Sequence, residues 1–220
     1  MTSLPKAIAF DWDGTLVNTL PLIFKANNHL RDVLGYPAWS HDEFLKAIPH
    51  STRDIFPKLY GDRAQEATDL LYEYLGKHHL QELELLDGAQ DLIDALMETE
   101  IPLVVVSNKR HDNLLKEIDH LGWGKFFSSI VGAGRAERDK PDPAPLHMAM
   151  GELPHSVVLD SNVWFIGDME SDMKIAQAAG CSSVLLLNGE DKTDLVEKFN
   201  PLHVLQGCAD LRQVLQDSIK

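Results

Sequence analysis

The sequence predicts an α/β fold, a doubly wound parallel sheet that carries an inserted all-helical domain. Three observations lead to this expectation. Short apolar runs of strand length alternate with amphipathic helical patterns over most of the chain. Residues 18–86 interrupt this rhythm with helical patterns alone. Polar motifs also follow directly after several of the apolar runs, where a sheet of this class binds its ligands.

The predicted strands are short apolar runs, as expected of strands buried on both faces. They lie at residues 7–10, 103–106, 163–166 and 184–187, with a weaker candidate at 128–132. The predicted helices between them carry apolar residues on one face and end near a glycine where one is available. They cover residues 89–96, 114–121 before Gly122, and 171–179 before Gly180.

The interruption is interpreted as an inserted domain, with residues 18–86 forming a helical unit and residues 1–17 and 87–220 the α/β core. A simple crossover helix would need far fewer residues. Two apolar stripes predict helices, and X-Pro pairs predict the breaks between helices. The first stripe is Ile23, Ala26, Leu30 and Leu34, before Gly35; the second is Ala64, Ala67, Leu71, Tyr74 and Leu75. The breaks are expected at Tyr36-Pro37, Ile48-Pro49 and Phe56-Pro57.

The composition limits the classes of partner. The formal net charge is −14, and such a surface repels nucleic acid and anionic membranes, so neither is an expected partner. No apolar run approaches the ~20 residues of a membrane-spanning helix, and the short stretch before residue 11 leaves no room for a signal peptide. We therefore expect a cytoplasmic protein, and leave open whether it is a monomer or a homodimer. Cys181 and Cys208 are expected to be small buried residues. An anionic substrate would need local positive charge at its site.

The strongest motif is Asp11-Trp12-Asp13-Gly14-Thr15, directly after the first predicted strand. Two carboxylates this close are stable only if a cation or a raised pKa relieves their repulsion. Mg²⁺ suits the place because it binds a few carboxylate oxygens and keeps water molecules for its other positions. The alternative is a solvated turn, since Asp and Gly both favour turns.

Two further motifs supply positive or donor groups. Ser107-Asn108 closes the second strand and is predicted to open the next helix, where a hydroxyl and free N–H groups form a phosphate cradle. An ordinary helix cap is the alternative. Lys140, followed by Pro141, would neutralise the negative charge of both a phosphoryl group and the Asp11 carboxylate. Because Arg135 and Arg138 lie nearby in sequence, an exposed basic loop is the rival interpretation.

The fourth motif, residues 167–172, again follows an apolar run. Asp168 would complete a metal site with Asp11 and Asp13. Asp172 would lie near a helix start, where it would hold Lys140 or the water molecules of the metal. Its alternative role is a favourable charge in the first turn of a helix.

These four motifs resemble those of the haloacid dehalogenase superfamily. Residues 11–15 resemble its first motif, Ser107 its second, Lys140 its third and residues 167–172 its fourth. The resemblance covers nearly the whole chain, and the helical insertion resembles the superfamily's first class of cap domain. In style the chain is most similar to the phosphoglycolate phosphatases. One departure is Asn18, where many relatives carry an acidic residue.

The resemblance implies a magnesium-dependent phosphatase acting on a small phosphorylated metabolite. Asp11 would attack phosphorus and form an aspartyl-phosphate. Asp13 would protonate the leaving group and then activate water. Mg²⁺ would bind Asp11, Asp168 and the backbone carbonyl of Asp13. The phosphate would contact Lys140 and a set of polar residues, namely Thr15, Ser107 and Asn108. In the cap, Arg53 is expected to bind a substrate carboxylate or second phosphate, or else to pair with Asp54 or Glu43.

Several alternatives stay open at this point. A sugar phosphomutase, a pyrophosphatase and a nucleotidase would share the same motifs. A metal-free dehalogenase would not need Asp13, because halide leaves without a proton. A phosphonoacetaldehyde hydrolase would need a Schiff-base lysine in the cap, and none of Lys25, Lys46, Lys58 and Lys77 stands out. From a different class, a binding module would hold a phosphoryl group without turnover.

Overall fold

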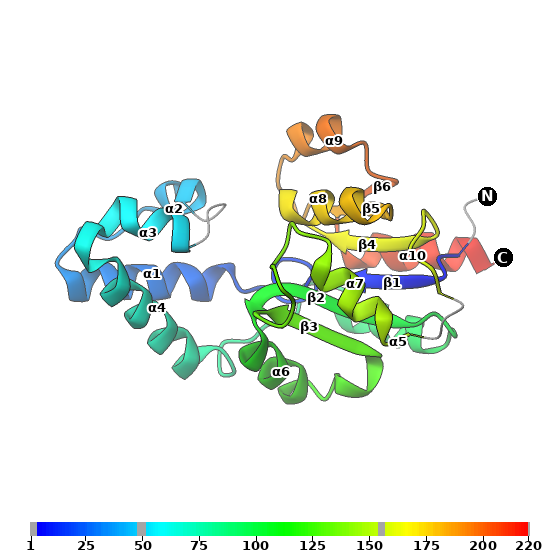
Figure 1. Cartoon of the computed structure of the whole chain (residues 1–220), viewed down its shortest axis with the longest axis horizontal. Helices are drawn as coiled ribbons and strands as arrows, with labels where there is room; N and C mark the ends of the chain where they lie inside the picture. Colours follow the sequence, from blue (N-terminus) through cyan, green and yellow to red (C-terminus); the bar gives the residue numbers. More distant parts are fainter. Residues whose placement is uncertain (1–3, 48–51, 154–156, 220) are drawn as a thin grey trace. The chain divides into compact units, whose positions relative to one another are not determined.

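The computed structural model describes residues 4–47, 52–153 and 157–219. The chain divides into two compact units, Met1–Asn18 with Glu84–Lys220, and Thr19–Leu83. The larger unit contains the whole β-sheet and the smaller one is helical (Figure 1). Each is described by itself below.

A six-stranded parallel sheet forms the centre of the larger unit. Its strands are β1 (Ala7–Phe10), β2 (Leu103–Arg110), β3 (Ser129–Ala133), β4 (Val163–Gly167), β5 (Ser182–Leu186) and β6 (His203–Leu205). They lie in the order β3-β2-β1-β4-β5-β6, and every pairing is parallel. The strand order therefore reverses at β1, with β2 on one side and β4 on the other. This is the doubly wound sheet that the sequence predicts, and the ligand site of such a sheet lies beyond the carboxyl end of the strand where the order reverses.

The central strands are buried on both faces, which explains their continuous apolar sequences. All four residues of β1 are inaccessible to solvent. Because successive side chains of a strand point to opposite faces, Ala7 and Ala9 join one core cluster with Val104 and Phe165. Ile8 and Phe10 then point to the other face. Both layers of core thus hold β1 in place, and with it the residues that follow Phe10.

Helices cover both faces of the sheet (Figure 1). They are α5 (Ala89–Met97), α6 (His111–His120), α7 (Ala144–Gly151), α8 (Glu170–Ala179), α9 (Thr193–Phe199) and α10 (Cys208–Ile219). The helices α7 and α8 lie on one face, where Leu146 and Ile175 belong to the same core cluster as Ala9. Right-handed crossovers place α5 and α6 on the opposite face, and α10 packs against α5.

The smaller unit consists of helices α1 (Leu20–Leu34), α2 (His41–Ala47), α3 (Thr52–Tyr60) and α4 (Ala64–His78), with a short 3-10 turn, η1 (Gly61–Arg63). Its core is apolar and drawn from α1, α3 and α4, namely Ala26, Leu30, Leu34, Phe56, Tyr60, Ala67 and Leu71. Gly35, with φ 76°, ends α1 by donating to the carbonyls of Arg31 and Asp32. The helical stripes expected from the sequence supply most of this core.

The insertion leaves and re-enters the larger unit at one point. The N–H of Asn18 donates to the carbonyl of Glu84 at 2.8 Å, and the N–H of Leu86 donates to Leu16 at 3.0 Å. Between these bonds, Val17 and Leu85 form an antiparallel bridge. The two ends of the insertion are therefore held side by side within the larger unit.

Two sequence expectations about local structure are wrong. Pro57 does not break the chain but lies inside α3, where one missing N–H removes a single helical hydrogen bond and the remaining turns persist. Ser107-Asn108 does not open a helix, because β2 continues to Arg110 with a register shift after Val106, and α6 begins at His111. The Ile48-Pro49 break lies outside the described residues.

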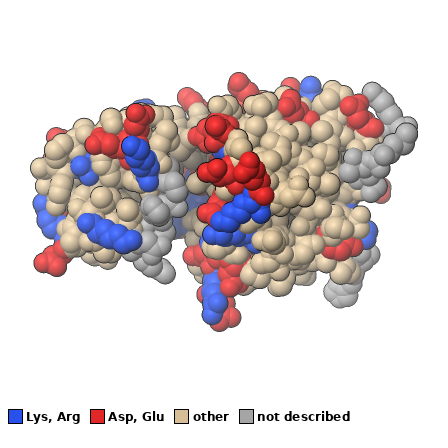
Figure 2. Space-filling view, turned by 90° about the horizontal axis from the view of Figure 1, so that it is seen from above, with Lys and Arg blue, Asp and Glu red and all other residues tan. Residues whose placement is uncertain are grey.

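The exterior carries mixed charge. On the face drawn in Figure 2, acidic and basic side chains lie next to one another. Exposed ion pairs occur in the larger unit, for example Lys198 with Glu170. Within the residues that the structure describes, no helix has the length and apolar character needed to span a membrane. Both cysteines are free thiols; Cys208 is buried and Cys181 partly so.

Candidate active site at the carboxyl end of the sheet

The residues after β1 turn sharply at the place where the strand order reverses. Asp11 continues the strand ladder, its N–H donating to Ile166 of β4 at 2.9 Å. The chain then folds back, and Leu16 and Val17 both donate to the carbonyl of Trp12. Gly14 has φ 77°, and a Cβ there would come within 2.7 Å of the Asp168 carboxylate. Only glycine suits this conformation and this close approach.

Lys140 lies between two of the aspartates expected at the site. Its Nζ is 2.6 Å from Oδ1 of Asp11 and 2.8 Å from Oδ1 of Asp172. The Lys140 side chain is 3% exposed, whereas the neighbouring Arg135 and Arg138 are exposed, so the interpretation as an exposed basic loop does not apply to Lys140. An ammonium group in this place neutralises charge within the site.

Asn108 fixes the backbone that carries this lysine. Its side-chain oxygen accepts from the N–H of Lys140 at 2.9 Å, and its amide nitrogen donates to the Lys140 carbonyl at 3.0 Å. The neighbouring Ser107 is buried, and its hydroxyl oxygen accepts from the N–H of Lys109 at 3.1 Å. The extended end of β2 therefore links the second and third sequence motifs. The Asn108 side-chain amide is taken up by hydrogen bonds to the backbone of Lys140.

Asp168 follows β4 and lies beside Asp11 in the cluster. Its carboxylate lies 3.3 Å from Nζ of Lys192 and 3.5 Å from the buried hydroxyl of Thr15. Lys192 also donates to the carbonyls of Asp168 and Leu186, at 2.8 and 3.2 Å. These several acceptors offset the cost of burying the lysine side chain. Lys192 thereby holds Asp168 from the side of β5.

Asp172 sits in the first turn of α8 and folds back toward β4. Its Oδ2 accepts from the N–H groups of Asp168 and Met169, at 3.1 and 2.9 Å. Gly167 makes room for this arrangement, because a Cβ at that position would overlap the Asp172 side chain. Since its other oxygen accepts from Lys140, Asp172 connects the fourth motif to the third.

The charges of this cluster do not balance. Oxygen atoms of Asp11, Asp168 and Asp172 lie within 4.8 Å of one another, and all three residues are buried. Burial, followed by repulsion from Asp172, raises the pKa of Asp11 well above its ordinary value in spite of Lys140. Burial raises the pKa of Asp168 to about 6 against the attraction of Lys192. For Lys140, the attraction of Asp11 and Asp172 outweighs burial and raises its pKa.

This donor set fits a hard divalent cation. Mg²⁺ prefers carboxylate and carbonyl oxygens and is commonly held by one or two carboxylates together with water. Asp11 and Asp168 offer such oxygens side by side, and a cation there would offset the burial and the repulsion that raise their pKa values. Asp172 already accepts from Lys140 and two backbone N–H groups, so it supports the site from behind.

The Asp13 carboxylate lies outside this three-aspartate cluster. Its Oδ1 accepts from Nζ of Lys109 at 2.6 Å, and the side chain is 28% exposed. The same ammonium donates to buried Glu117 at 2.7 Å. Burial alone would lower the pKa of Lys109, but the two carboxylates outweigh it and raise that pKa. Asp13 is thus turned toward solvent, and a part in metal binding would fall to its backbone carbonyl.

Arg53 is the one predicted site residue outside the larger unit. Its backbone belongs to α3 (Thr52–Tyr60), and its side chain lies outside the described part of the chain. Its expected contact with substrate therefore stays a prediction.

The comparison with protein families adds to this geometry. Residues 8–186, which include all four motifs, match the family described as haloacid dehalogenase-like hydrolase. The chain belongs to the haloacid dehalogenase-like hydrolases.

Relatives of this hydrolase include phosphatases of two kinds. It is 28% identical over 218 residues to the pyrophosphatase PpaX of Listeria innocua, covering 99% of each chain. It is 27% identical over 221 residues to the phosphoglycolate phosphatase of Pectobacterium atrosepticum, covering 97% of this chain and 93% of the relative. Among solved structures, a haloacid dehalogenase superfamily hydrolase from Ehrlichia chaffeensis is 29% identical, with a TM-score of 0.68 and full coverage of both chains.

Three charged residues of the hydrolase's site were not expected from the sequence, namely Lys109, Glu117 and Lys192. Lys109 directly follows the second motif, whereas Glu117 and Lys192 lie well beyond the second and fourth motifs, and both lysines resemble solvated surface residues in sequence. Glu117 falls among the apolar positions of α6, next to Ile118, and this is the one available sign that it points inward.

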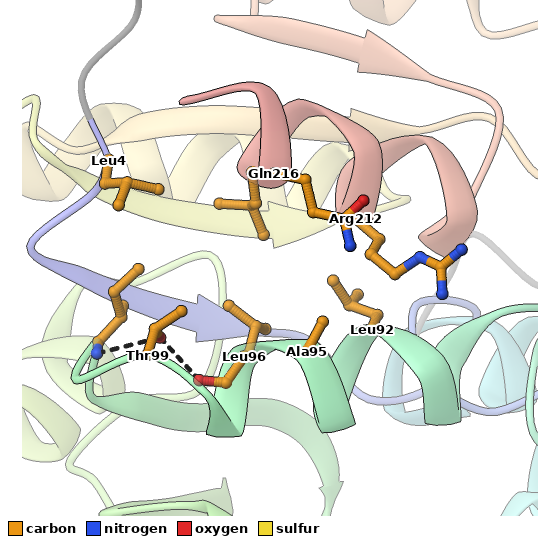
Figure 3. Close-up of a pocket in the computed structure, with 9 residues that line it drawn as sticks. Leu4, Leu92, Ala95, Leu96, Thr99, Arg212 and Gln216 are labelled. Atoms are coloured by element: carbon orange, nitrogen blue, oxygen red, sulfur yellow. Dashed lines mark hydrogen bonds between the residues drawn. The ribbon is translucent and has the colours of Figure 1, made fainter. Parts of the chain in front are cut away.

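A shallow apolar pocket lies elsewhere on the larger unit (Figure 3). It is formed between α5 and α10, and Thr99 at its rim bonds to the Leu96 carbonyl. None of the clustered carboxylates lines it. It therefore plays no part in the site at the strand ends.

Proposed function

We propose that this hydrolase is a magnesium-dependent phosphatase that cleaves a small phosphorylated metabolite through an aspartyl-phosphate on Asp11. One observation carries the proposal: the Asp11 carboxylate lies beside Asp168 and against Lys140 at the reversal point of the sheet. The full-length relatives named above support phosphate chemistry. A bound Mg²⁺ would supply positive charge that draws electron density from the transferring phosphoryl group.

In the first step, a carboxylate oxygen of Asp11 attacks phosphorus while the bond from phosphorus to the leaving oxygen breaks. Lys140 offsets the negative charge beside Asp11 and would contact the phosphoryl oxygens. Thr15, Ser107 and backbone N–H groups after Asp11 would hold the remaining oxygens. Asp13 gives its proton to the leaving oxygen, so the product departs as a neutral alcohol.

In the second step, water attacks the phosphorus of the aspartyl-phosphate. Asp13, now a carboxylate, takes the proton from this water, and the bond from phosphorus to Asp11 breaks. Inorganic phosphate leaves, and both aspartates return to their starting states. The partial exposure of Asp13 suits this role, because both the leaving group and the water arrive from solvent.

For the substrate, we propose a small carboxylated monoester such as phosphoglycolate, with the helical unit acting as a cap that excludes water. Arg53 of that unit would bind the substrate carboxylate. Pyrophosphate is the second candidate, because pyrophosphatase relatives match 99% of the chain. The two candidates differ in leaving group, which is an alkoxide in one and phosphate in the other.

A phosphate-release screen tests the proposal. Purified protein is incubated with Mg²⁺ and a panel that includes phosphoglycolate, pyrophosphate, a nucleotide, a sugar phosphate and para-nitrophenyl phosphate. Turnover should be lost in Asp11→Asn and retained in Asp194→Asn, which changes an exposed aspartate of α9. An isomeric sugar phosphate as product would indicate a mutase instead. Phosphoryl binding without release from any compound would indicate a binding module.

A further inference from the structure

The Asp13 carboxylate is held by a lysine that none of the four motifs contains. Nζ of Lys109 lies 2.6 Å from Oδ1 of Asp13 and 2.7 Å from Oε2 of Glu117. The exposed fraction of the side chain falls along this row, from 28% for Asp13 to 16% for Lys109 and 1% for Glu117. The three residues thus form a chain of charges that runs from the solvent side of the site into the core.

The buried end of this chain is rigidly placed. Glu117 belongs to α6, and its Oε2 also accepts from Nε1 of Trp12 at 2.7 Å. Trp12 is inaccessible to solvent and packs edge-on against Trp123, with ring centroids 5.9 Å apart. The carboxylate that anchors Lys109 is therefore held by its helix and by the indole of Trp12, which itself packs against Trp123.

Good packing alone does not require a buried ion pair between Lys109 and Glu117. A buried carboxylate and ammonium lose hydration, and an apolar pair of similar volume often packs as well or better. The lysine also reaches beyond Glu117 to a second carboxylate, that of Asp13. The contact with Asp13 limits where an otherwise solvent-facing side chain can point.

We propose that Lys109, anchored by Glu117 and Trp12, is a positioning residue that sets the Asp13 carboxylate for proton transfer. The inference rests on the proposed function, in which Asp13 gives a proton to the leaving oxygen and takes one from water. Lys109 itself exchanges no proton in either step. It fixes the distance and direction of the group that does, and misplacement by about 1 Å can lower a rate by about 10²-fold.

If Lys109 positions the acid, the effect of removing it should depend on the leaving group. A general structural role would not give this dependence. A poor leaving group such as an aliphatic alkoxide depends on protonation as it departs, whereas para-nitrophenolate departs readily as an anion. Loss of acid positioning should therefore slow alkyl phosphates far more than para-nitrophenyl phosphate. The relevant constant is kcat/KM, which reports the step that forms the aspartyl-phosphate.

The test compares Lys109→Met, Lys109→Arg and a control, Lys116→Met, which removes an exposed lysine one position before Glu117 on α6. For Lys109→Met, kcat/KM should fall about 10²-fold for alkyl phosphates and less than about 10-fold for para-nitrophenyl phosphate. With alkyl phosphates the fall should lie in kcat rather than KM. Lys109→Arg should recover part of it, and Lys116→Met should match the wild type.

Three results would overturn the inference while leaving the phosphatase intact. They are an unchanged kcat/KM in Lys109→Met, an equal loss with every leaving group, and a rise in KM alone, which would make Lys109 a substrate contact. If Lys109→Met does not fold, Glu117→Gln decides the question, because it keeps an acceptor for Trp12 and removes the charge that anchors Lys109. It should show the same leaving-group pattern. A wild-type protein that releases no phosphate would refute the proposed function itself.

Discussion

Nζ of Lys140 lies 2.6 Å from Oδ1 of Asp11, although these residues are 129 positions apart in the sequence. The same ammonium donates to Asp172 at 2.8 Å. Both contacts are buried, so the lysine neutralises charge and also fixes the orientation of the proposed nucleophile. Its removal should affect stability and turnover separately.

We expect Lys140→Met to lower kcat by about 10²–10³-fold, the range seen when one charge-stabilising donor is removed. It should also destabilise the fold by about 3 kcal/mol, because it leaves two buried carboxylates without their ammonium partner. The double variant Lys140→Met with Asp172→Asn should regain stability but not activity. Urea unfolding and steady-state kinetics measure the two effects, and a double variant no more stable than the single one would contradict this account.

Gly14→Ala should weaken Mg²⁺ binding, an effect separate from the backbone strain that the substitution also introduces. Gly14 has φ 77°, and an added Cβ would press on the Asp168 carboxylate at 2.7 Å. Gly180 has φ 73° with nothing within 4 Å of its Cβ position, so Gly180→Ala isolates the strain, about 1 kcal/mol. Calorimetric titration with Mg²⁺ should show weaker binding in Gly14→Ala and unchanged binding in Gly180→Ala. Equal affinities would refute the proposed metal position.

Removal of divalent cations should abolish turnover and leave the protein folded. Because Mg²⁺ would bind the native state, the free energy of unfolding should rise by about 2.7 kcal/mol at a concentration of 100 times the dissociation constant. The rise should disappear in Asp168→Asn and persist in the surface control Asp194→Asn. Thermal unfolding with and without Mg²⁺ measures it. The same rise in Asp168→Asn would place the cation elsewhere.

His203 should make the fold less stable in mild acid. Burial lowers its pKa, and its ring packs against Trp164 with centroids 5.2 Å apart. The unfolded chain then takes up a proton more readily than the native one, so stability is lost as pH falls through about 6.5. His203→Phe should lessen the fall in Tm between pH 7.5 and pH 5.5. His147→Gln, at an exposed position of α7, should leave the fall unchanged.

Much of the site could be predicted because three of the four motifs follow apolar residues of a strand with a clear pattern. Asp11, Ser107 and Asp168 all come directly after residues buried in β1, β2 and β4, and parallel strands bring their carboxyl ends to one edge. Lys140 lacks such a strand immediately before it. Its burial depends on Asn108, which is 32 residues away and holds its backbone through two hydrogen bonds.

Other parts depend on contacts that no local pattern records. Strand β6 has three residues, too few for a period to be recognised, and it exists because it pairs with β5. Lys109 and Lys192 resemble surface residues in sequence, since only the folded chain brings acceptors to them. At Pro57 the sequence predicts a break that the fold does not have. Packing of Phe56 and Tyr60 in the helical core outweighs the one lost hydrogen bond.

The paired ends of the helical insertion bear on how such a protein can evolve. Since Asn18 bonds to Glu84 and Leu16 to Leu86, the larger unit holds the two ends of the insertion side by side, as a short hairpin turn would. The length and sequence of the inserted helices can therefore drift without shifting the strand that carries Asp11. Exchange of the whole insertion at its two hydrogen-bonded ends would be a route to new substrates while the site residues of the larger unit stay unchanged.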